Sequence, residues 1–224
     1  MERYRLSRTQ GNTCYIEEAL DVHHLNHVAK KQPGDKVVAC DEKTSMIIEI
    51  TACHQRHIEG KHQGFSPRRS GWSRTLFGLA KIESKAYQAL HVQLMAMGAD
   101  LIIPLTSDQT RVFDNEASLE NEVESALSLT RLPLSSLRKT HILVLGRHPQ
   151  STPIHDALKL TRAGDDLLVL VGPESGWSST EMKRFEEAKS VCFVSLGDRV
   201  FRADTAALLS MGAIHAYRQS EVLG

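Results

Sequence analysis

The chain has 224 residues, 41% hydrophobic and 24% charged, and its 27 Lys+Arg balance its 27 Asp+Glu. This length allows one large domain or two smaller ones, and the composition is that of an ordinary globular protein. No apolar run approaches the ~20 residues of a membrane-spanning helix, and the polar start MERYRLSRTQ lacks the apolar segment of a secretory signal. We therefore expect a cytoplasmic protein with no membrane partner.

The cysteines and the charge distribution narrow the class further. Four cysteines without a Cys-x-x-Cys pair argue against a disulfide framework and a four-cysteine zinc site. Residues 1–81 carry 13 Lys+Arg against 9 Asp+Glu, and the remainder carries 14 against 18. A basic N-terminal part indicates a polyanion partner such as RNA, although a solvated Arg-rich loop would explain the same charge.

The first ~65 residues have the pattern of short strands and turns. The apolar runs 37–40 and 46–50 flank a polar connection and predict a hairpin, and only DVHHLNHVAKK has helical spacing. We predict a small β-barrel over residues 1–66. The Gly-, Pro-, Ser- and Arg-rich stretch EGKHQGFSPRRSGWSR then breaks the pattern and predicts a linker, which we place at 67–75.

The rest of the chain, 76–224, alternates short apolar runs with helical or loop segments. TLFGLA, LIIPLT, HILVLG, LLVLV and VCFVSLG are the runs, and a helix-like stretch covers 84–97. Continuous apolar strands alternating with helices predict an α/β domain whose parallel sheet is covered on both faces.

One strand end is unusual. In LLVLVGPESGWSSTEM the run ends at Gly172-Pro173, Gly176 follows, and a Ser-x-x-Glu capping box at Ser178 and Glu181 predicts the start of a helix. Glu174 occupies the position of a nucleophilic serine, which excludes a hydrolase elbow. The loop also lacks the phosphate-binding and dinucleotide-binding glycine patterns. By itself, it is explained equally well as a plain tight turn.

A second strand, 191–196, also ends in a glycine loop, at Leu196-Gly197. Arg199 and Arg202 follow, and Asp204 or Thr205 is expected to cap a helix. Two such strands in one sheet would place their loops side by side at the carboxyl edge, where open α/β sheets bind ligands.

Together, VGPESGWSSTEM and VSLGDRVFRADTAALLSMGAI resemble the signatures of the RsmE family, SPOUT-class methyltransferases that modify N3 of a uridine in 16S ribosomal RNA. RYRL, HHLNHVAKKQPGD and MIIEITA resemble, more loosely, the PUA-like RNA-binding barrel of that family. The resemblance implies a PUA-like barrel followed by a trefoil-knotted SPOUT domain. It also implies a homodimer, S-adenosylmethionine as cofactor, and ribosomal RNA or the small ribosomal subunit as partner.

The resemblance also implies site residues. Arg202 is the candidate for stabilising the negative charge that develops on the uridine oxygens when N3 loses its proton, with pairing to Glu174 or Asp204 as the structural alternative. The implied cofactor contacts are Leu145, Gly172, Pro173, Glu174, Ser175, Gly176, Leu196, Gly197, Val200, Phe201, Arg202 and Thr205. The candidate RNA contacts are Arg3, His23, His24, Lys30, Arg68, Arg69 and Arg74; packing of a histidine and a flexible arginine-rich linker are the alternatives.

Several positions depart from the family pattern. Ser175 stands where the family has glycine, and Gln93 and Ala96 occupy positions that are charged in the family. The middle of the chain diverges most, so the cofactor is better supported than the RNA. A non-catalytic paralogue that binds RNA and an enzyme with a different RNA remain alternatives. Cys53, His54, His57 and His62 match no common zinc spacing, and we expect no metal.

Overall fold

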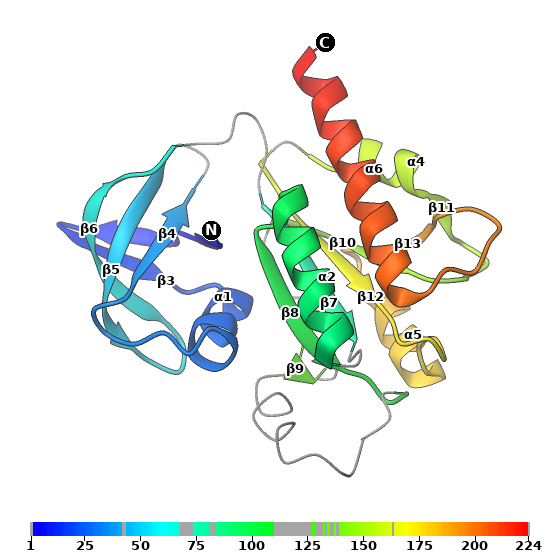
Figure 1. The fold of residues 1–224 in the computed structure, drawn as a ribbon, viewed down its shortest axis with the longest axis horizontal. Helices are drawn as coiled ribbons and strands as arrows, with labels where there is room; N and C mark the ends of the chain where they lie inside the picture. The colour runs from blue at the N-terminus through cyan, green and yellow to red at the C-terminus, as the bar shows by residue number, and fades with distance from the viewer. Residues whose placement is uncertain are drawn as a thin grey trace.

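The chain folds around two sheets, seen side by side in Figure 1. This computed structural model describes residues 2–41, 44–67, 74–80, 84–109, 127–128, 132, 134, 137, 139–162 and 164–223. The N-terminal unit, residues 2–67, contains a six-stranded sheet in the order β1-β4-β5-β6-β3-β2. The C-terminal unit, from residue 74 onward, contains a seven-stranded sheet in the order β11-β13-β10-β12-β7-β8-β9.

The elements of the two units follow one another along the chain. The N-terminal unit consists of β1 (Arg3–Arg5), β2 (Arg8–Gln10), β3 (Thr13–Ile16), α1 (Ala19–His23), the π-helix η1 (His24–Val28), β4 (Lys36–Cys40), β5 (Ser45–Cys53) and β6 (Ile58–Phe65). The C-terminal unit consists of β7 (Thr75–Ala80), α2 (Ser84–Met97), β8 (Leu101–Thr106), β9 (Leu127–Ser128), β10 (Thr140–Leu145), β11 (Thr152–Pro153), α4 (Ile154–Lys159), β12 (Asp166–Val171), α5 (Ser179–Glu187), β13 (Val191–Ser195) and α6 (Ala203–Leu223).

The N-terminal sheet confirms the predicted hairpin, because β4 and β5 pair antiparallel. The stretch from Glu59 that was taken to break the strand pattern begins inside a strand. Residues 58–65 form β6, which pairs with both β5 and β3. Ile58 and Gly60 of this strand are buried, and the polar residues after them are half-buried or exposed. A strand with only one buried face tolerates such polar positions.

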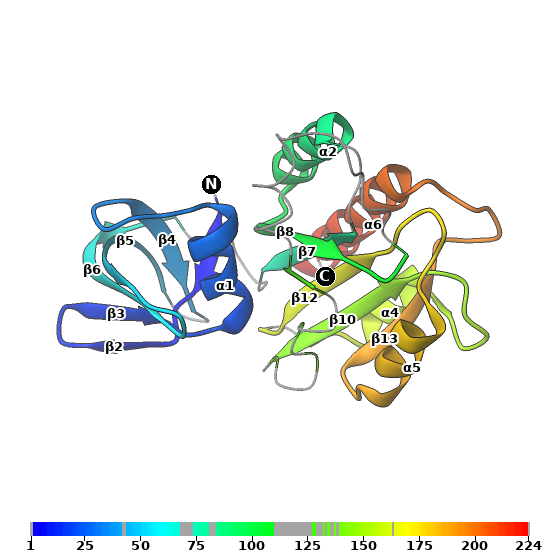
Figure 2. The same cartoon turned by 90° about the horizontal axis from the view of Figure 1, so that it is seen from below.

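The C-terminal sheet is parallel throughout its described strands, as predicted. Alternate strand residues form two apolar layers. One layer packs against α2, α4 and α6, and the other packs against α5 and continues into the core of the N-terminal unit. Figure 2 shows α2 and α6 on one side of the sheet and α5 on the other. Helix α2 spans the predicted residues 84–97.

A buried ionic cluster joins the two units. The Arg74 guanidinium donates to both carboxylate oxygens of Asp21 at 2.7 Å and, through Nη2, to Asp166 Oδ2 at 2.6 Å. Arg5 adds a second cation, with Nη2 3.0 Å from Asp166 Oδ1. Arg74 is 4% exposed, so these contacts are shielded from water. They hold α1 and β1 against the amino ends of β7 and β12.

The two carboxylates of this cluster respond differently to burial. Burial raises the pKa of Asp21, and the positive charge of Arg74 only partly opposes it. Burial would also raise the pKa of Asp166, but the charges of Arg74 and Arg5 outweigh it and lower that pKa. For Arg74 burial disfavours the charge, and the neighbouring Asp166 and Asp21 nevertheless raise its pKa. All three groups are therefore mutually dependent, since each charge is tolerated only beside its partners.

We expect Arg74→Met to destabilise the protein by about 3–5 kcal/mol at pH 7, because it leaves two buried carboxylates without a cation. The stability that Asp166 contributes is present above its unfolded pKa of about 3.9 and is lost as pH falls through the lowered folded value. The difference in free energy of unfolding between Arg74→Met and wild type should therefore become smaller below about pH 4. Urea unfolding followed by circular dichroism measures it. Arg162→Met, at an exposed arginine, is the control, and equal losses in both variants would contradict the role of the cluster.

His24 provides a second stability test. Its ring is 1% exposed, with Nδ1 3.1 Å from the Tyr4 hydroxyl and Nε2 3.7 Å from Glu2 Oε1. Burial lowers the pKa of His24 to about 4, although Glu2 opposes this. Between about pH 6.5 and 4 the unfolded chain therefore takes up a proton that the folded chain does not.

We expect the free energy of unfolding to fall by up to about 2 kcal/mol between pH 7 and pH 5 on account of His24. His24→Gln should remove this part of the pH dependence, whereas His155→Gln, at an exposed histidine, should keep it. Urea unfolding of the three proteins at both pH values makes the comparison. Identical pH dependence in wild type and His24→Gln would contradict the assignment.

Candidate functional site

Three central strands of the C-terminal sheet end level with one another. Leu145, the last residue of β10, is in register with Val171 of β12 and with Val194 of β13. The two glycine loops therefore leave the same edge of the sheet. The sequence had led us to expect these loops side by side. They are instead separated, because β10 lies between β12 and β13. The end of β10, with Leu145 and Gly146, consequently lies between the two loops.

The first glycine loop, Gly172–Ser178, ends in the predicted helix cap. Ser178 Oγ accepts from the Glu181 backbone N–H at 3.1 Å, and the Glu181 side chain accepts from the Ser178 N–H at 2.8 Å. This capping box starts α5, and Phe185 of that helix is buried. The turn itself closes with a 2.8 Å bond from the Gly176 N–H to the Pro173 carbonyl, and Gly176 has a left-handed φ of 82°.

Trp177 is a residue of this site that the sequence reasoning missed. Its indole Nε1 donates to the Leu145 carbonyl at 3.2 Å, which ties the first loop to the end of β10. A Cβ on Gly172 would lie 2.8 Å from Trp177 Cε2. Gly172 thus leaves room for the indole. The signal was available, because the family motif has an aromatic residue at this position.

The segment that follows β8 also contacts the first loop. Asp108 Oδ2 accepts from Ser178 Oγ at 2.7 Å, and the Asp108 backbone N–H donates to Glu181 Oε1 at 3.0 Å. Ser175, which replaces the family glycine, directs its Oγ to the Gln109 carbonyl at 3.4 Å. The added hydroxymethyl group is exposed and faces this segment. No sequence pattern linked residues 108–109 to the loop, since they lie more than 60 positions away.

The second glycine loop, residues 196–202, reaches the first through an ion pair. Arg202 Nε lies 3.5 Å from Glu174 Oε1 and 3.9 Å from Asp204 Oδ1. The Arg202 and Glu174 side chains are 73% and 70% exposed, so solvent screens the pair, and its contribution to stability is about 0–1 kcal/mol. Both of the expected structural partners of Arg202 are therefore present. Its guanidinium nevertheless stays accessible to a ligand.

The remaining predicted cofactor contacts lie around these loops. Gly197 has a φ of 114°, a conformation that favours glycine, and its N–H donates to Ser195 Oγ at 3.1 Å. Leu196 and Phe201 are half-buried, whereas Val200 is 77% exposed. Helix α6 begins at Ala203, slightly before the predicted caps, and Thr205 is exposed in its first turn. The structure thus gathers the predicted set at one edge but leaves Val200 in solvent.

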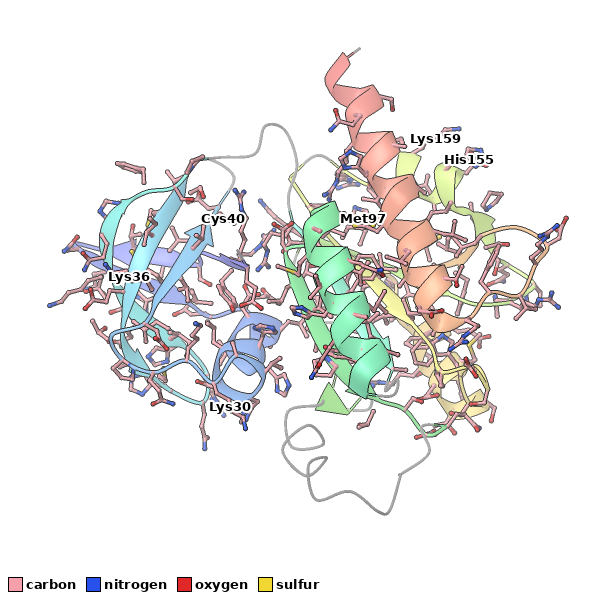
Figure 3. The ribbon with its side chains drawn as sticks, in the orientation of Figure 1. Lys30, Lys36, Cys40, Met97, His155 and Lys159 are labelled. Carbon is pink, nitrogen blue, oxygen red and sulfur yellow. The ribbon has the colours of Figure 1, made fainter. Side chains whose placement is uncertain are left out.

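The predicted RNA contacts fall into three groups. Arg74 and His24 are buried and Arg3 is largely enclosed, with its Nη2 donating to the Pro67 carbonyl at 2.9 Å. This placement corrects their assignment, because their charge or ring is used inside the protein. Lys30 is exposed at the end of η1, as Figure 3 shows, and His23 is half-buried. Arg68 and Arg69 lie outside the described residues.

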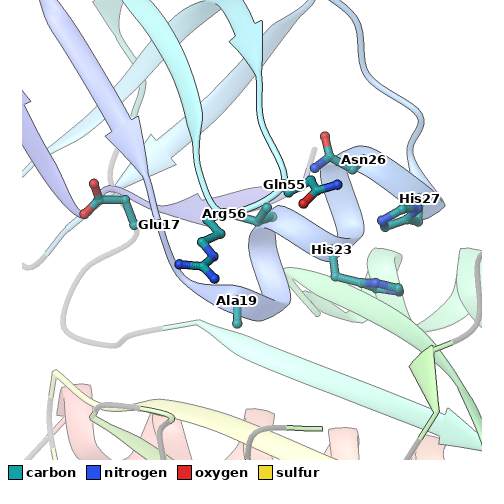
Figure 4. A pocket seen from close by; sticks show the side chains of 8 residues that line it. Glu17, Ala19, His23, Asn26, His27, Gln55 and Arg56 are labelled. Carbon is teal, nitrogen blue, oxygen red and sulfur yellow. The ribbon is translucent and has the colours of Figure 1, made fainter. Parts of the chain in front are cut away.

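His23 lines a hollow of about 450 Å³ in the N-terminal unit, shown in Figure 4. The hollow lies between the α1–η1 segment and the turn that connects β5 to β6. Its lining is mainly polar, and sequence reasoning identified only His23 among Glu17, Ala19, Val22, His23, Asn26, His27, Gln55 and Arg56. It is separate from the glycine loops, which belong to the other sheet.

Comparisons with known proteins agree with this architecture. A family model described as an RNA methyltransferase domain matches residues 116–215. The ribosomal RNA small subunit methyltransferase E of Rickettsia conorii is 26% identical over 80 residues, which is 35% of this chain and 33% of that protein. The match thus spans about a third of the relative's length.

Two solved structures share the fold across the chain. Methyltransferase E from Neisseria gonorrhoeae, bound to S-adenosyl methionine, has a TM-score of 0.52 and 18% identity, covering 96% of this chain and 97% of that one. A Legionella pneumophila protein in complex with the same cofactor has a TM-score of 0.55 and 15% identity, covering 96% of each chain. Within the described residues, no helix is long and apolar enough to cross a membrane.

The family match defines the class: residues 116–215, in the C-terminal part of the chain, match an RNA methyltransferase domain. The chain is similar to RsmE proteins at low identity, which is consistent with a divergent RsmE-like protein. The predicted α/β fold is confirmed.

We expect Gly172→Ala to destabilise the protein by about 1–3 kcal/mol, because the new methyl group would overlap the Trp177 indole. Gly146→Ala is a matched control at the end of the neighbouring strand, where a Cβ would lie 3.7 Å from the same ring, an ordinary contact. Urea unfolding gives the stability difference, and near-ultraviolet circular dichroism reports the indole. Equal effects of the two changes would contradict the proposed fit between Gly172 and Trp177.

Proposed function

We propose that this protein is an S-adenosylmethionine-dependent RNA methyltransferase and that N3 of a uridine in 16S ribosomal RNA is its target. The observation that carries the proposal is the pairing of two glycine loops at the carboxyl edge of one parallel sheet, joined by the contact between Glu174 and Arg202. The RNA methyltransferase domain and the SAM-bound structural relatives support the cofactor. The RsmE-like sequence match supports the choice of substrate.

The residues at this edge fit the proposed cofactor. Tight loops expose backbone N–H and C=O groups that can read an adenine edge, and no atom of the described residues lies within 4 Å of where a Cβ on Gly176 or Gly197 would stand. The Ser175 hydroxymethyl group is turned toward the Gln109 carbonyl, 3.4 Å away. We assign the backbone of Leu145, of Gly172–Gly176 and of Leu196–Gly197 to the adenosine, with Leu196 and Phe201 as apolar contacts. Val200, Arg202 and Thr205 complete the proposed set.

The chemistry requires mainly positioning and charge. The cofactor would supply a methyl group on a sulfonium, which the deprotonated uridine nitrogen would take in an in-line displacement that breaks the S–C bond and leaves S-adenosylhomocysteine. Loss of the N3 proton places negative charge on the uridine oxygens, and Arg202 is the cation we assign to that charge. Glu174 and Asp204, at 3.5 and 3.9 Å, hold its guanidinium at the mouth of the site. RNA that covers this exposed arginine would exclude water and strengthen its effect.

The family resemblance supports further proposals about the whole protein. We propose that residues 1–66 form a PUA-like RNA-binding barrel, 67–75 a linker and 76–224 a trefoil-knotted SPOUT domain. A homodimer in the cytoplasm is the proposed form of the enzyme. In the N-terminal unit, His23 at the hollow and the exposed Lys30 remain the proposed RNA contacts, together with Arg68 and Arg69. Lys30 is exposed, and His23 lies at the wall of the hollow outside the buried cluster.

We expect the protein to transfer labelled methyl groups from S-adenosylmethionine to small ribosomal subunits that lack the modification, with the label mapping to one uridine. Calorimetry should show binding of S-adenosylhomocysteine. Label at another nucleotide would mean that the proposed target uridine is wrong and that the enzyme modifies that other nucleotide. Binding of S-adenosylhomocysteine without transfer to any RNA would favour a non-catalytic, RNA-binding paralogue. Absence of binding would exclude the cofactor.

The same assay tests the role of Arg202. Arg202→Ala should slow transfer on the order of 10²-fold while S-adenosylhomocysteine still binds, because the side chain acts on charge that develops only during the reaction. Arg162→Ala is the control, since this exposed arginine precedes β12 at the opposite edge of the sheet. Unchanged transfer by Arg202→Ala would leave Arg202 with only its structural contacts.

A further inference from the structure

The turn between β5 and β6 brings two histidines together. His54 and His57 are the first and last residues of this four-residue connection, and the His54 N–H donates to the His57 carbonyl at 2.9 Å. Their rings stack, with centroids 4.4 Å apart and planes inclined by 27°. The hairpin therefore presents two imidazoles on the same side of its tip.

A carboxylate completes the cluster. Glu59, the second residue of β6, follows two residues after His57, the last residue of the connection. Glu59 Oε1 is 3.1 Å from His57 Nε2 and 3.9 Å from His54 Nε2. One ligand atom from each of the three side chains lies within 4.8 Å of the other two.

These distances suit a small divalent cation of the first transition row. Zinc binds histidine nitrogen and carboxylate oxygen at about 2.0–2.2 Å in tetrahedral geometry, which places neighbouring ligand atoms about 3.3 Å apart. The two separations to Glu59 bracket that value, and the nitrogens of His54 and His57 lie within 4.8 Å of each other. We propose that His54, His57 and Glu59 form a zinc site with three protein ligands and one position left for water or a ligand.

The site differs from the Cys53, His54, His57 and His62 group that the sequence suggested. Cys53 directs its sulfur to the Lys31 carbonyl at 3.5 Å, and the His62 ring packs edge-on against Phe65. Both are thereby separated from the pair at the turn. Glu59, which is not a member of that group, supplies the third ligand atom. The expectation of no metal rested on linear spacing, whereas a hairpin brings ligands together through its turn.

The proposed zinc site lies at the wall of the hollow in the N-terminal unit. Gln55 and Arg56, the two residues between the histidines, line the 450 Å³ hollow of the N-terminal unit. Asn26, which also lines it, donates from Nδ2 to the His54 carbonyl at 2.9 Å. An ion held by the histidines and Glu59 would therefore fix the wall of the hollow that carries Arg56. The three ligand side chains are 32–49% exposed, so the ion can enter from solvent.

Calorimetric titration of the untagged full-length protein with zinc chloride tests the proposal. Wild type should bind one ion, and His54→Asn and His57→Asn should each weaken binding roughly tenfold or more, with a smaller loss for Glu59→Gln. His155→Asn is the matched control: His155 Nε2 also lies 3.1 Å from a carboxylate, that of Asp156, but on α4 of the other unit, where Figure 3 labels it. Far-ultraviolet circular dichroism checks that each variant is folded.

Cobalt chloride provides a second readout, which reports the coordination geometry of the bound ion. Four-coordinate cobalt absorbs much more strongly in the visible range than the hydrated ion, so wild type and His155→Asn should develop this band, and the folded His54 and His57 variants should not. The proposal is overturned if wild type takes up neither ion, or if the band and the binding persist in both histidine variants.

Discussion

The contacts of Arg74 with Asp21 and Asp166 are the constraint on which the rest of the structure depends. A charge buried this deeply is tolerated only when its partners are fixed in place, so the guanidinium determines how α1 and β1 lie against β7 and β12. The planar, forked donor set of arginine suits this task, since it bonds two carboxylates in different directions, as a lysine ammonium could not do with the same geometry. The cluster sits at the amino ends of the strands. Their carboxyl ends, where the glycine loops leave, remain free of the N-terminal unit's ionic contacts among the described residues.

The strand β12 connects these two ends directly. Asp166 begins it beside Arg74, and Gly172 follows its last residue beside the Trp177 indole. The first loop is consequently fixed on three sides: by the indole bond to Leu145, by the capping box of α5, and by Asp108. The second loop is held to it by the exposed contact between Arg202 and Glu174. One wall of the proposed cofactor site is thus built rigidly, and the other carries the side chain that we assign to the reaction.

The uneven charge of the chain also acquires a structural explanation. Three arginines of the basic N-terminal part contact carboxylates of the acidic remainder, because Arg5 and Arg74 meet Asp166 and Arg3 approaches Asp100 to 4.0 Å. Part of the positive charge that had indicated a polyanion partner is therefore used in ion pairs within the protein. The basic groups that stay exposed, such as Lys30 and Arg56, are the ones that can face RNA. Counting charges along the sequence cannot separate these two uses, because it contains no information on which pairs meet.

The sequence by itself determined the local features. Continuous apolar runs predicted the parallel sheet, the Ser-x-x-Glu pattern predicted the cap of α5 at Ser178, and two motifs pointed to the RsmE-like domain, because each depends on residues close together in the chain. Only the tertiary structure decided what depends on distant residues. It placed β10 between the two glycine loops, directed Ser175 toward Gln109, and buried Arg74 and His24. It also showed that Glu59 belongs to a strand and lies beside His54 and His57. The physical reason is the same in each case: burial, ion pairing and ligand geometry depend on which side chains meet in space, and the pattern along the chain records only those that are neighbours in sequence.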